Sequence, residues 1–119
     1  GSLELHAEGR LATLLLPLDM LRRSGGTFDE TEGFVNYASS MHGVHAAALF
    51  RETGPQETRV SLRASGLVDV AALAREFGGG GHPNAAGLTI AAAVPVACAR
   101  VIEAALRHLA AGRVAAGEA

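Results

Sequence analysis

The sequence has no lysine and no tryptophan, and it has a single cysteine, Cys98. One cysteine cannot form a disulfide within the chain, so a packed core must hold the fold together. Aromatic residues make up only 4% of the 119 residues, whereas 49% are hydrophobic. These proportions exclude a disordered tail, a collagen-like chain and a disulfide scaffold, and they predict one soluble globular domain.

An excess of charge of one sign is also missing. Twelve acidic residues and ten arginines give a formal net charge of -2, so no global basic field favours non-specific binding of nucleic acid. An anion site must therefore be local, and arginine suits planar two-point contacts to phosphate. The absence of lysine excludes a P-loop, and the absence of a Gly-x-Ser-x-Gly motif argues against a serine hydrolase.

Long apolar runs are absent as well. The run Leu11–Leu16 is far too short to span a membrane, and the N-terminus lacks the pattern of a signal peptide. We therefore expect a cytoplasmic protein with no membrane partner. Residues 1–2, Gly-Ser, resemble the remainder of an expression tag, which suggests a longer natural protein. One domain is expected over residues 3–112, followed by a frayed tail over 113–119.

Hydrophobic periodicity predicts an α/β (α+β) fold, with a mixed sheet of four to five strands and helices packed on it. The expected strands are Leu11–Leu16, Val44–Arg51, Thr58–Ala64 and Leu88–Ala91. Short helices are expected after Pro17 and Asp29, and a further one over Val70–Phe77 behind an Asp69 cap. A last helix from Pro95 is expected to bury a stripe made of Val94, Cys98, Val101, Ile102, Ala105, Leu106 and Leu109, and to leave Arg100, Glu103, Arg107 and His108 off it.

The strand predicted at Thr58–Ala64 has two chemically different faces. Alternate residues of a strand point to opposite sides, so the core face is Val60, Leu62 and Ala64, and the other is Arg59, Ser61 and Arg63. This second face predicts a phosphate-binding surface led by Arg63; its alternative is a solvated polar surface. Arg51 either reaches the same groove or pairs with Glu52 or Glu57.

The segment 77–87, Phe-Gly-Gly-Gly-Gly-His-Pro-Asn-Ala-Ala-Gly, is the least ordinary part of the chain. Four ordered glycines cost backbone entropy, so the fold must use their freedom or their missing side chains. Pro83 fits the first position of a helix, which predicts a helix start whose amides at 80–82 face an anion. No acidic residue occurs from 78 to 93 to repel a phosphate. The alternative is a flexible connector with an exposed histidine.

Other candidate residues have simpler explanations. His42 and His45 are three residues apart, but they lack neighbouring carboxylate or cysteine ligands, so no metal site is predicted. Cys98 lies on an apolar stripe without an adjacent base and is interpreted as a buried structural thiol. Packing of a helix on the sheet explains Tyr37, and we leave both Asn36 and Tyr37 out of the site.

Segment 77–87 closely resembles the glycine-histidine motif of the DHHA1 domain in DHH-family phosphoesterases. Residues 32–37 (EGFVNY), 43–52 (GVHAAALFRE) and 60–82 (VSLRASGLVDVAALAREFGGGGH) are similar to the C-terminal half of the oligoribonuclease and pAp phosphatase group, the nanoRNases. The resemblance covers nearly the whole chain. The histidine motif separates it from the related domain of alanyl-tRNA synthetases, where an Arg-Pro-Asp-Met type of sequence is expected after the glycines.

The resemblance implies a substrate-binding domain that holds the phosphate of a short oligoribonucleotide or of pAp. Residues matching the family's phosphate motif are Gly79, Gly80, Gly81 and His82, with Arg63 matching the arginine of the preceding strand. The family's strand commonly reads Ser-x-Arg-Ser, whereas Ala64 follows Arg63 here, so a contact from Ser61 or from Ser65 stays open.

The resemblance also implies that two manganese ions lie in a separate N-terminal DHH domain of the same chain. This sequence has no Asp-His-His run, so we expect it to bind no cofactor and to be inactive by itself. Relatives that cut cyclic dinucleotides or single-stranded DNA leave the substrate length open, and the parent could be a homodimer. The alternatives are a non-enzymatic nucleotide- or RNA-binding module and a structural or dimerisation domain.

Overall fold

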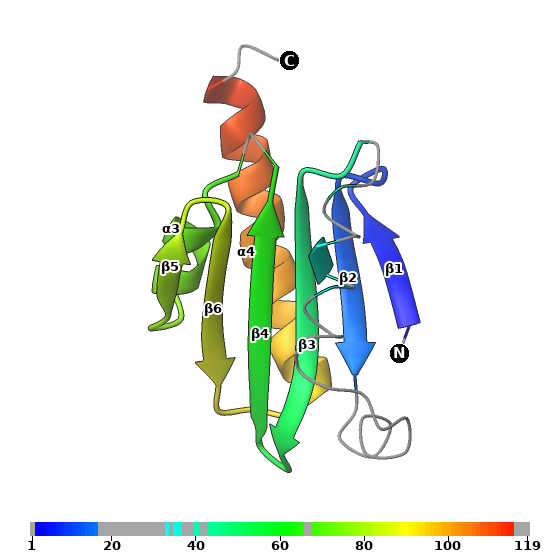
Figure 1. The fold of residues 1–119 in the computed structure, drawn as a ribbon, viewed down its shortest axis with the longest axis vertical. Helices are drawn as coiled ribbons and strands as arrows, with labels where there is room; N and C mark the ends of the chain where they lie inside the picture. Colours follow the sequence, from blue (N-terminus) through cyan, green and yellow to red (C-terminus); the bar gives the residue numbers. More distant parts are fainter. Residues whose placement is uncertain are drawn as a thin grey trace.

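The computed structural model describes residues 2–16, 33, 35–36, 40, 43–65 and 68–115. Six strands form one mixed sheet in the order β1-β2-β3-β4-β6-β5 (Figure 1). The strands are β1 (Ser2–His6), β2 (Leu11–Leu16), β3 (Ala46–Gly54), β4 (Glu57–Ala64), β5 (Gly80–His82) and β6 (Ala85–Ile90). β2 and β3 run parallel, and every other pair of neighbours is antiparallel. The expected α+β class is confirmed, with one strand more than the upper expectation.

The expected helices divide between the described and the undescribed parts of the chain. The structure gives α3 (Val70–Arg75) and α4 (Val94–Ala115), and α4 continues three residues past Gly112. The helix expected after Pro17 lies outside the described residues. Of the helix expected after Asp29, only Gly33, Val35 and Asn36 are described, and all three are helical. Neither α3 nor α4 has the length and apolar character needed to cross a membrane.

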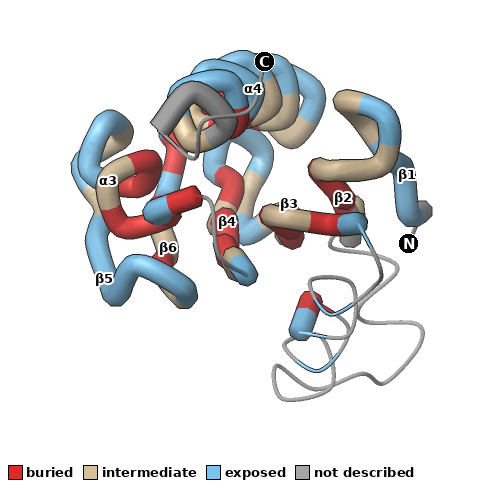
Figure 2. Tube along the Cα trace, turned by 90° about the horizontal axis from the view of Figure 1, so that it is seen from above, coloured by how far each residue is buried: buried red, intermediate tan, exposed pale blue. Residues whose placement is uncertain are grey.

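The sheet has an apolar layer on each face of its central strands (Figure 2). Alternate residues of β3 point to opposite sides: Ala46, Ala48 and Phe50 pack in the larger cluster, which contains α3 and α4. Ala47 and Leu49 pack in a smaller cluster with Val35. This two-sided burial explains why the sequence of β3 begins as a continuous apolar run.

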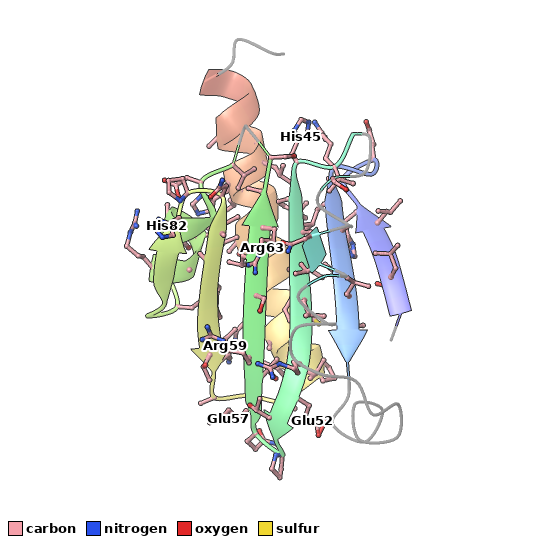
Figure 3. The ribbon with its side chains drawn as sticks, viewed as in Figure 1. His45, Glu52, Glu57, Arg59, Arg63 and His82 are labelled. Carbon is pink, nitrogen blue, oxygen red and sulfur yellow. The ribbon has the colours of Figure 1, made fainter. Side chains whose placement is uncertain are left out.

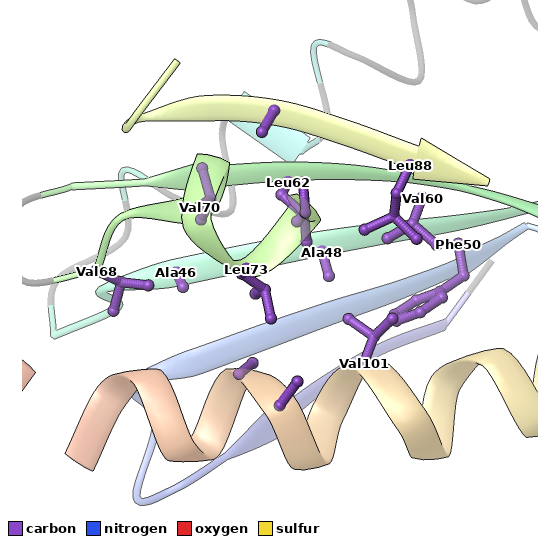
Figure 4. Close-up of a cluster of buried hydrophobic side chains, with 14 of the residues drawn as sticks. Ala46, Ala48, Phe50, Val60, Leu62, Val68, Val70, Leu73, Leu88 and Val101 are labelled. Atoms are coloured by element: carbon purple, nitrogen blue, oxygen red, sulfur yellow. The ribbon is translucent and has the colours of Figure 1, made fainter. Parts of the chain in front are cut away.

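The larger cluster is the core beneath the helices. Phe50 of β3, Leu62 of β4 and Val101 of α4 are each at most 2% exposed, and Figure 4 shows Phe50 beside Val101. The stripe predicted for α4 is largely confirmed by the buried Val101, Ala105 and Leu109. Leu106 is an error, because it is 38% exposed. At about 100° per residue it lies roughly a third of a turn from the middle of the stripe.

Asp69 starts α3 as the sequence predicts. Its carboxylate accepts a hydrogen bond of 3.1 Å from the backbone N–H of Ala72, the geometry of an N-cap. Gly78 follows the helix with φ of +82°, a conformation that glycine adopts without strain. These two residues fix where α3 begins and where the chain turns into the glycine segment.

The helix start expected at Pro83 is wrong. Gly80–His82 is strand β5, which pairs with the first residues of β6 through a turn at Pro83 and Asn84. The turn is bonded on two sides, since Pro83 O accepts from Val70 N at 2.8 Å and Asn84 O accepts from Ala64 N at 3.0 Å. Proline suits a turn as well as a helix start, and these long-range bonds select the hairpin. β6 therefore begins three residues before the expected Leu88.

An ion-pair cluster joins the end of α3 to α4. The Glu76 carboxylate lies 2.5 Å from His108 Nε2 and 3.1 Å from Arg107 Nη2. His108 was expected to lie off the buried stripe of α4. It is half-buried, and its ring contacts Glu76. The hydrogen bond with His108, and then that with Arg107, holds the pKa of Glu76 below its ordinary value of 4.5.

We expect this cluster to stabilise the fold only while Glu76 is ionised. A lowered pKa contributes stability above the unfolded value and loses it as the pH falls through the folded value. Urea unfolding of the wild type and of Glu76→Gln should therefore differ most above pH 4.5, by less than about 1 kcal/mol because the pair is exposed, and should converge in acid. Glu103→Gln is the control, as this exposed residue has no ion-pair partner among the described side chains. If the stability difference between the wild type and Glu76→Gln grew as the pH fell, ionised Glu76 would not be the stabilising form.

Candidate functional site

The predicted cationic face of β4 and the glycine motif meet in one open pocket, which we call the arginine trough. Its volume is about 250 Å³. Its lining residues are Arg59, Ser61, Arg63, Gly80, Gly81, Ala85, Ala86 and Gly87. The two motifs are 16 residues apart in sequence, and the sheet brings them together because β6 pairs with both β4 and β5 (Figure 3). None of the lining residues is acidic, so the trough is suited to an anion.

Two hydrogen bonds hold Arg63 in place. Its Nε donates to Asn36 Oδ1 at 2.8 Å, and its Nη1 donates to the Leu62 carbonyl at 2.8 Å. Asn36 reaches it from the segment anchored by Val35, which is fully buried beneath the same face of the sheet. A guanidinium fixed by such bonds loses little freedom when it binds a ligand.

Asn36, which we left out of the predicted site, contacts Arg63. It lies in segment 32–37, whose similarity to the family was a signal that pointed to it. The structure shows its side chain exposed and bonded to Arg63. Tyr37, which we left out with it, lies outside the described residues.

Replacing Asn36 should weaken the trough without removing any charge. Asn36→Ala takes away the acceptor that orients Arg63 Nε, so we expect the affinity for a phosphate ligand to fall about three- to tenfold. In an Arg63→Gln background the same change should have almost no further effect, because the bond it removes is already gone. Two additive losses in this double-mutant cycle, measured by NMR titration, would contradict the positioning role.

Arg59 lies along the other side of the trough. Its Nη1 donates to Thr89 Oγ1 at a long 3.4 Å, the one hydrogen bond it makes within the described chain. The guanidinium covers Gly87, where an added Cβ would come within 2.5 Å of Nη2. The missing side chain at 87 is therefore what lets Arg59 extend across β6.

The two serines have different surroundings. Ser61 is only 4% exposed and lines the trough between the two arginines. Ser65 instead donates its hydroxyl to the Val44 carbonyl at 2.9 Å, and its N–H to the His45 carbonyl at 3.0 Å. Of the two, Ser61 is the one that the structure places in the trough.

The glycines of the motif fall into two groups. Gly80 and Gly81 line the trough, whereas Gly79 packs behind it, where a Cβ would lie 2.2 Å from Gly87 O. Gly81 has φ of +149°, and a Cβ there would lie 2.6 Å from Ala85 O. His82 is exposed on β5 and is not a lining residue of the trough; β6 separates it from Arg63 (Figure 3).

The remaining candidates do not join the trough. Arg51 lies opposite Arg59 in the β3–β4 register but does not line the pocket. His42 is outside the described residues, and His45 is half-buried with its N–H bonded to Arg10 O. Cys98 is half-buried, and burial raises the pKa of its thiol to about 11, which agrees with a structural role. Among the described residues, no three of His, Cys, Asp and Glu gather as a metal site.

The glycine hairpin and the arginine-bearing strand are the two features on which the resemblance to the DHHA1 domain of DHH phosphoesterases rested. The family model of the DHHA1 domain matches residues 11–111, and the chain belongs to this family. The resemblance inferred from the sequence is thereby confirmed.

One curated relative and two solved structures are similar to the chain. It is 34% identical over 84 residues to the bifunctional oligoribonuclease and PAP phosphatase NrnA of Bacillus subtilis (strain 168), covering 71% of this chain and 26% of that protein. An exopolyphosphatase-related protein of Bacteroides fragilis has a similar structure, with a TM-score of 0.76 and 24% identity over 98% of this chain and 33% of its own. The pGpG-specific phosphodiesterase PggH of Vibrio cholerae gives a TM-score of 0.59 and 18% identity, over 92% of this chain and 36% of its own.

The two solved structures support the fold. The chain spans about a quarter of the curated relative and about a third of the solved ones.

Proposed function

We propose that this chain is the substrate-binding domain of a metal-dependent DHH-family phosphoesterase that hydrolyses short oligoribonucleotides or pAp. In this scheme the arginine trough holds a phosphate group of the substrate. The single observation that carries the proposal is that Arg63, Ser61, Gly80 and Gly81 line one pocket with no acidic residue. The similarity to a bifunctional oligoribonuclease and PAP phosphatase supports this substrate class.

Each group in the trough has a chemical task in the proposal. Arg63 supplies a charge-assisted contact, and its planar guanidinium matches two oxygens of one phosphate. Ser61 is placed to donate its hydroxyl to the same group. Gly80 and Gly81 let the backbone of β5 approach the ligand closely, since neither carries a side chain. His82 supplies a further donor at the outer strand.

Catalysis itself is assigned to a separate DHH domain. The fold family implies two divalent metal ions, expected to be manganese, but the described residues of this chain bring no suitable set of ligands together. The chain's own contribution is to bind and orient the phosphate, which lowers the entropic cost of the reaction that the partner domain performs.

The proposal is tested by an amide NMR titration of this chain with pAp and with the 5′-phosphorylated diribonucleotide pApA. We expect shifts centred on Arg63 and on residues 79–82, which weaken when salt is added because the ligand is anionic. Thermal unfolding of each variant confirms that the fold is kept.

Matched variants decide the outcome. His82→Ala should reduce the shifts, whereas Arg100→Gln, which removes an exposed charge from α4 on the other face of the sheet, should leave them unchanged. Shifts that are absent from the trough at several millimolar ligand, or that are equally lost in Arg100→Gln, would overturn the phosphate-binding role.

A further inference from the structure

The geometry points to a second phosphate subsite at Arg59, separate from the one at Arg63. This inference rests on the proposed function and deepens it: the trough would take a ligand with two phosphate groups linked through a nucleoside, one phosphate at each arginine.

The two guanidinium groups turn away from each other. Arg63 turns toward Asn36, on the side of the sheet where Val35 packs on β3. Arg59 turns the opposite way, across β6, toward Thr89 and over Gly87. Their Cα atoms are four residues apart on one strand, about 13 Å at the usual rise. Two cations arranged in this way suit two anionic groups better than one.

Within the described residues, Arg59 uses little of its hydrogen-bonding capacity. A guanidinium has five N–H donors, and the described chain offers this one a single long bond, to a hydroxyl, and no carboxylate. A half-buried arginine without an acidic partner is normally satisfied by water or by an anion. Thr89 beside it adds a hydroxyl that can donate to the same anion.

Gly87 leaves room for the Arg59 guanidinium. A side chain here would come within 2.5 Å of the Arg59 guanidinium and would displace it. Gly87 also lines the trough, opposite Ser61. Its missing side chain therefore leaves space for the Arg59 guanidinium and for a ligand. The two arginines and Gly87 therefore line one pocket, which a ligand with two phosphate groups can occupy.

The test compares two ligands that differ by one phosphate, pApA and ApA, in NMR titrations of the wild type, Arg59→Gln, Arg63→Gln and Arg100→Gln. We expect Arg59→Gln to weaken pApA about tenfold and ApA less than about twofold. Gly87→Ala should give the same selective loss without removing a charge, because it moves the Arg59 guanidinium. Arg100→Gln is the charge-matched control and should bind both ligands as the wild type does.

The outcomes separate this inference from the proposed function. If Arg59→Gln binds pApA like the wild type, or weakens both ligands equally, while Arg63→Gln weakens both, the second subsite is overturned and the proposed function stands. If Arg63→Gln changes neither ligand, the proposed function fails, whatever Arg59→Gln shows.

Discussion

Arg63→Gln is expected to weaken the binding of pApA by about 30-fold or more, the largest loss of affinity among single substitutions in the trough. A hydrogen bond to a charged group contributes about 1.5 to 3 kcal/mol, and tenfold in affinity corresponds to about 1.4 kcal/mol. Glutamine removes the positive charge and the planar pair of donors but keeps a polar side chain. The loss should show in an NMR titration at low salt.

Arg63→Lys separates charge from geometry. Lysine keeps the positive charge, but it cannot match two phosphate oxygens at once or keep both bonds to Asn36 and the Leu62 carbonyl. We expect an affinity between those of the wild type and Arg63→Gln, with a similar dependence on salt. Wild-type affinity in Arg63→Gln would contradict the central role of this arginine, and wild-type affinity in Arg63→Lys would contradict the two-point contact.

Gly79→Ala is expected to lower the free energy of unfolding by about 2 to 3 kcal/mol, because an added side chain has no room against β6. Its Cβ would lie 2.2 Å from the Gly87 carbonyl oxygen and 2.9 Å from Leu88 Cα. Both are backbone atoms of β6, so relieving the clash requires β5 and β6 to move apart. Urea unfolding followed by circular dichroism measures the loss.

Two neighbouring glycines provide matched controls. A Cβ at Gly80 meets nothing within 4 Å, so Gly80→Ala should be neutral or slightly stabilising. Gly78 also has open space but φ of +82°, so Gly78→Ala should cost about 1 kcal/mol for conformation alone. Equal losses of stability at all three positions would contradict this explanation, because any added side chain would then destabilise the motif whatever its contacts.

Much of the fold could be predicted where the signal is local. Alternation along β4 correctly separated Val60 and Leu62 from Arg59, Ser61 and Arg63, because a strand points successive side chains to opposite faces. The Asp69 cap was also recognised, since it depends on bonds within one turn of the helix. Leu106 was wrongly assigned to the buried stripe of α4. The stripe is centred on small residues, which give a weaker hydrophobic signal than leucine.

The lining of the trough was predicted only in part. Arg63, Ser61, Gly80 and Gly81 were candidates from the sequence, and the structure places all four in the trough. Gly79 and His82 were candidates as well, but they lie outside its lining. Asn36 was missed because its partner is 27 residues away, and no local pattern shows which distant side chain accepts from an arginine.

The sequence by itself determined the fold class, the two faces of β4 and the family, because these depend on side-chain periodicity and on a distinctive motif. Only the tertiary structure decided that the glycine motif is a hairpin, that Asn36 orients Arg63, and that Arg59 turns away across β6. The physical reason is that Pro83 is compatible with a helix start and with a turn. The choice between them is made by hydrogen bonds to Ala64 and Val70, which exist only when the sheet has assembled.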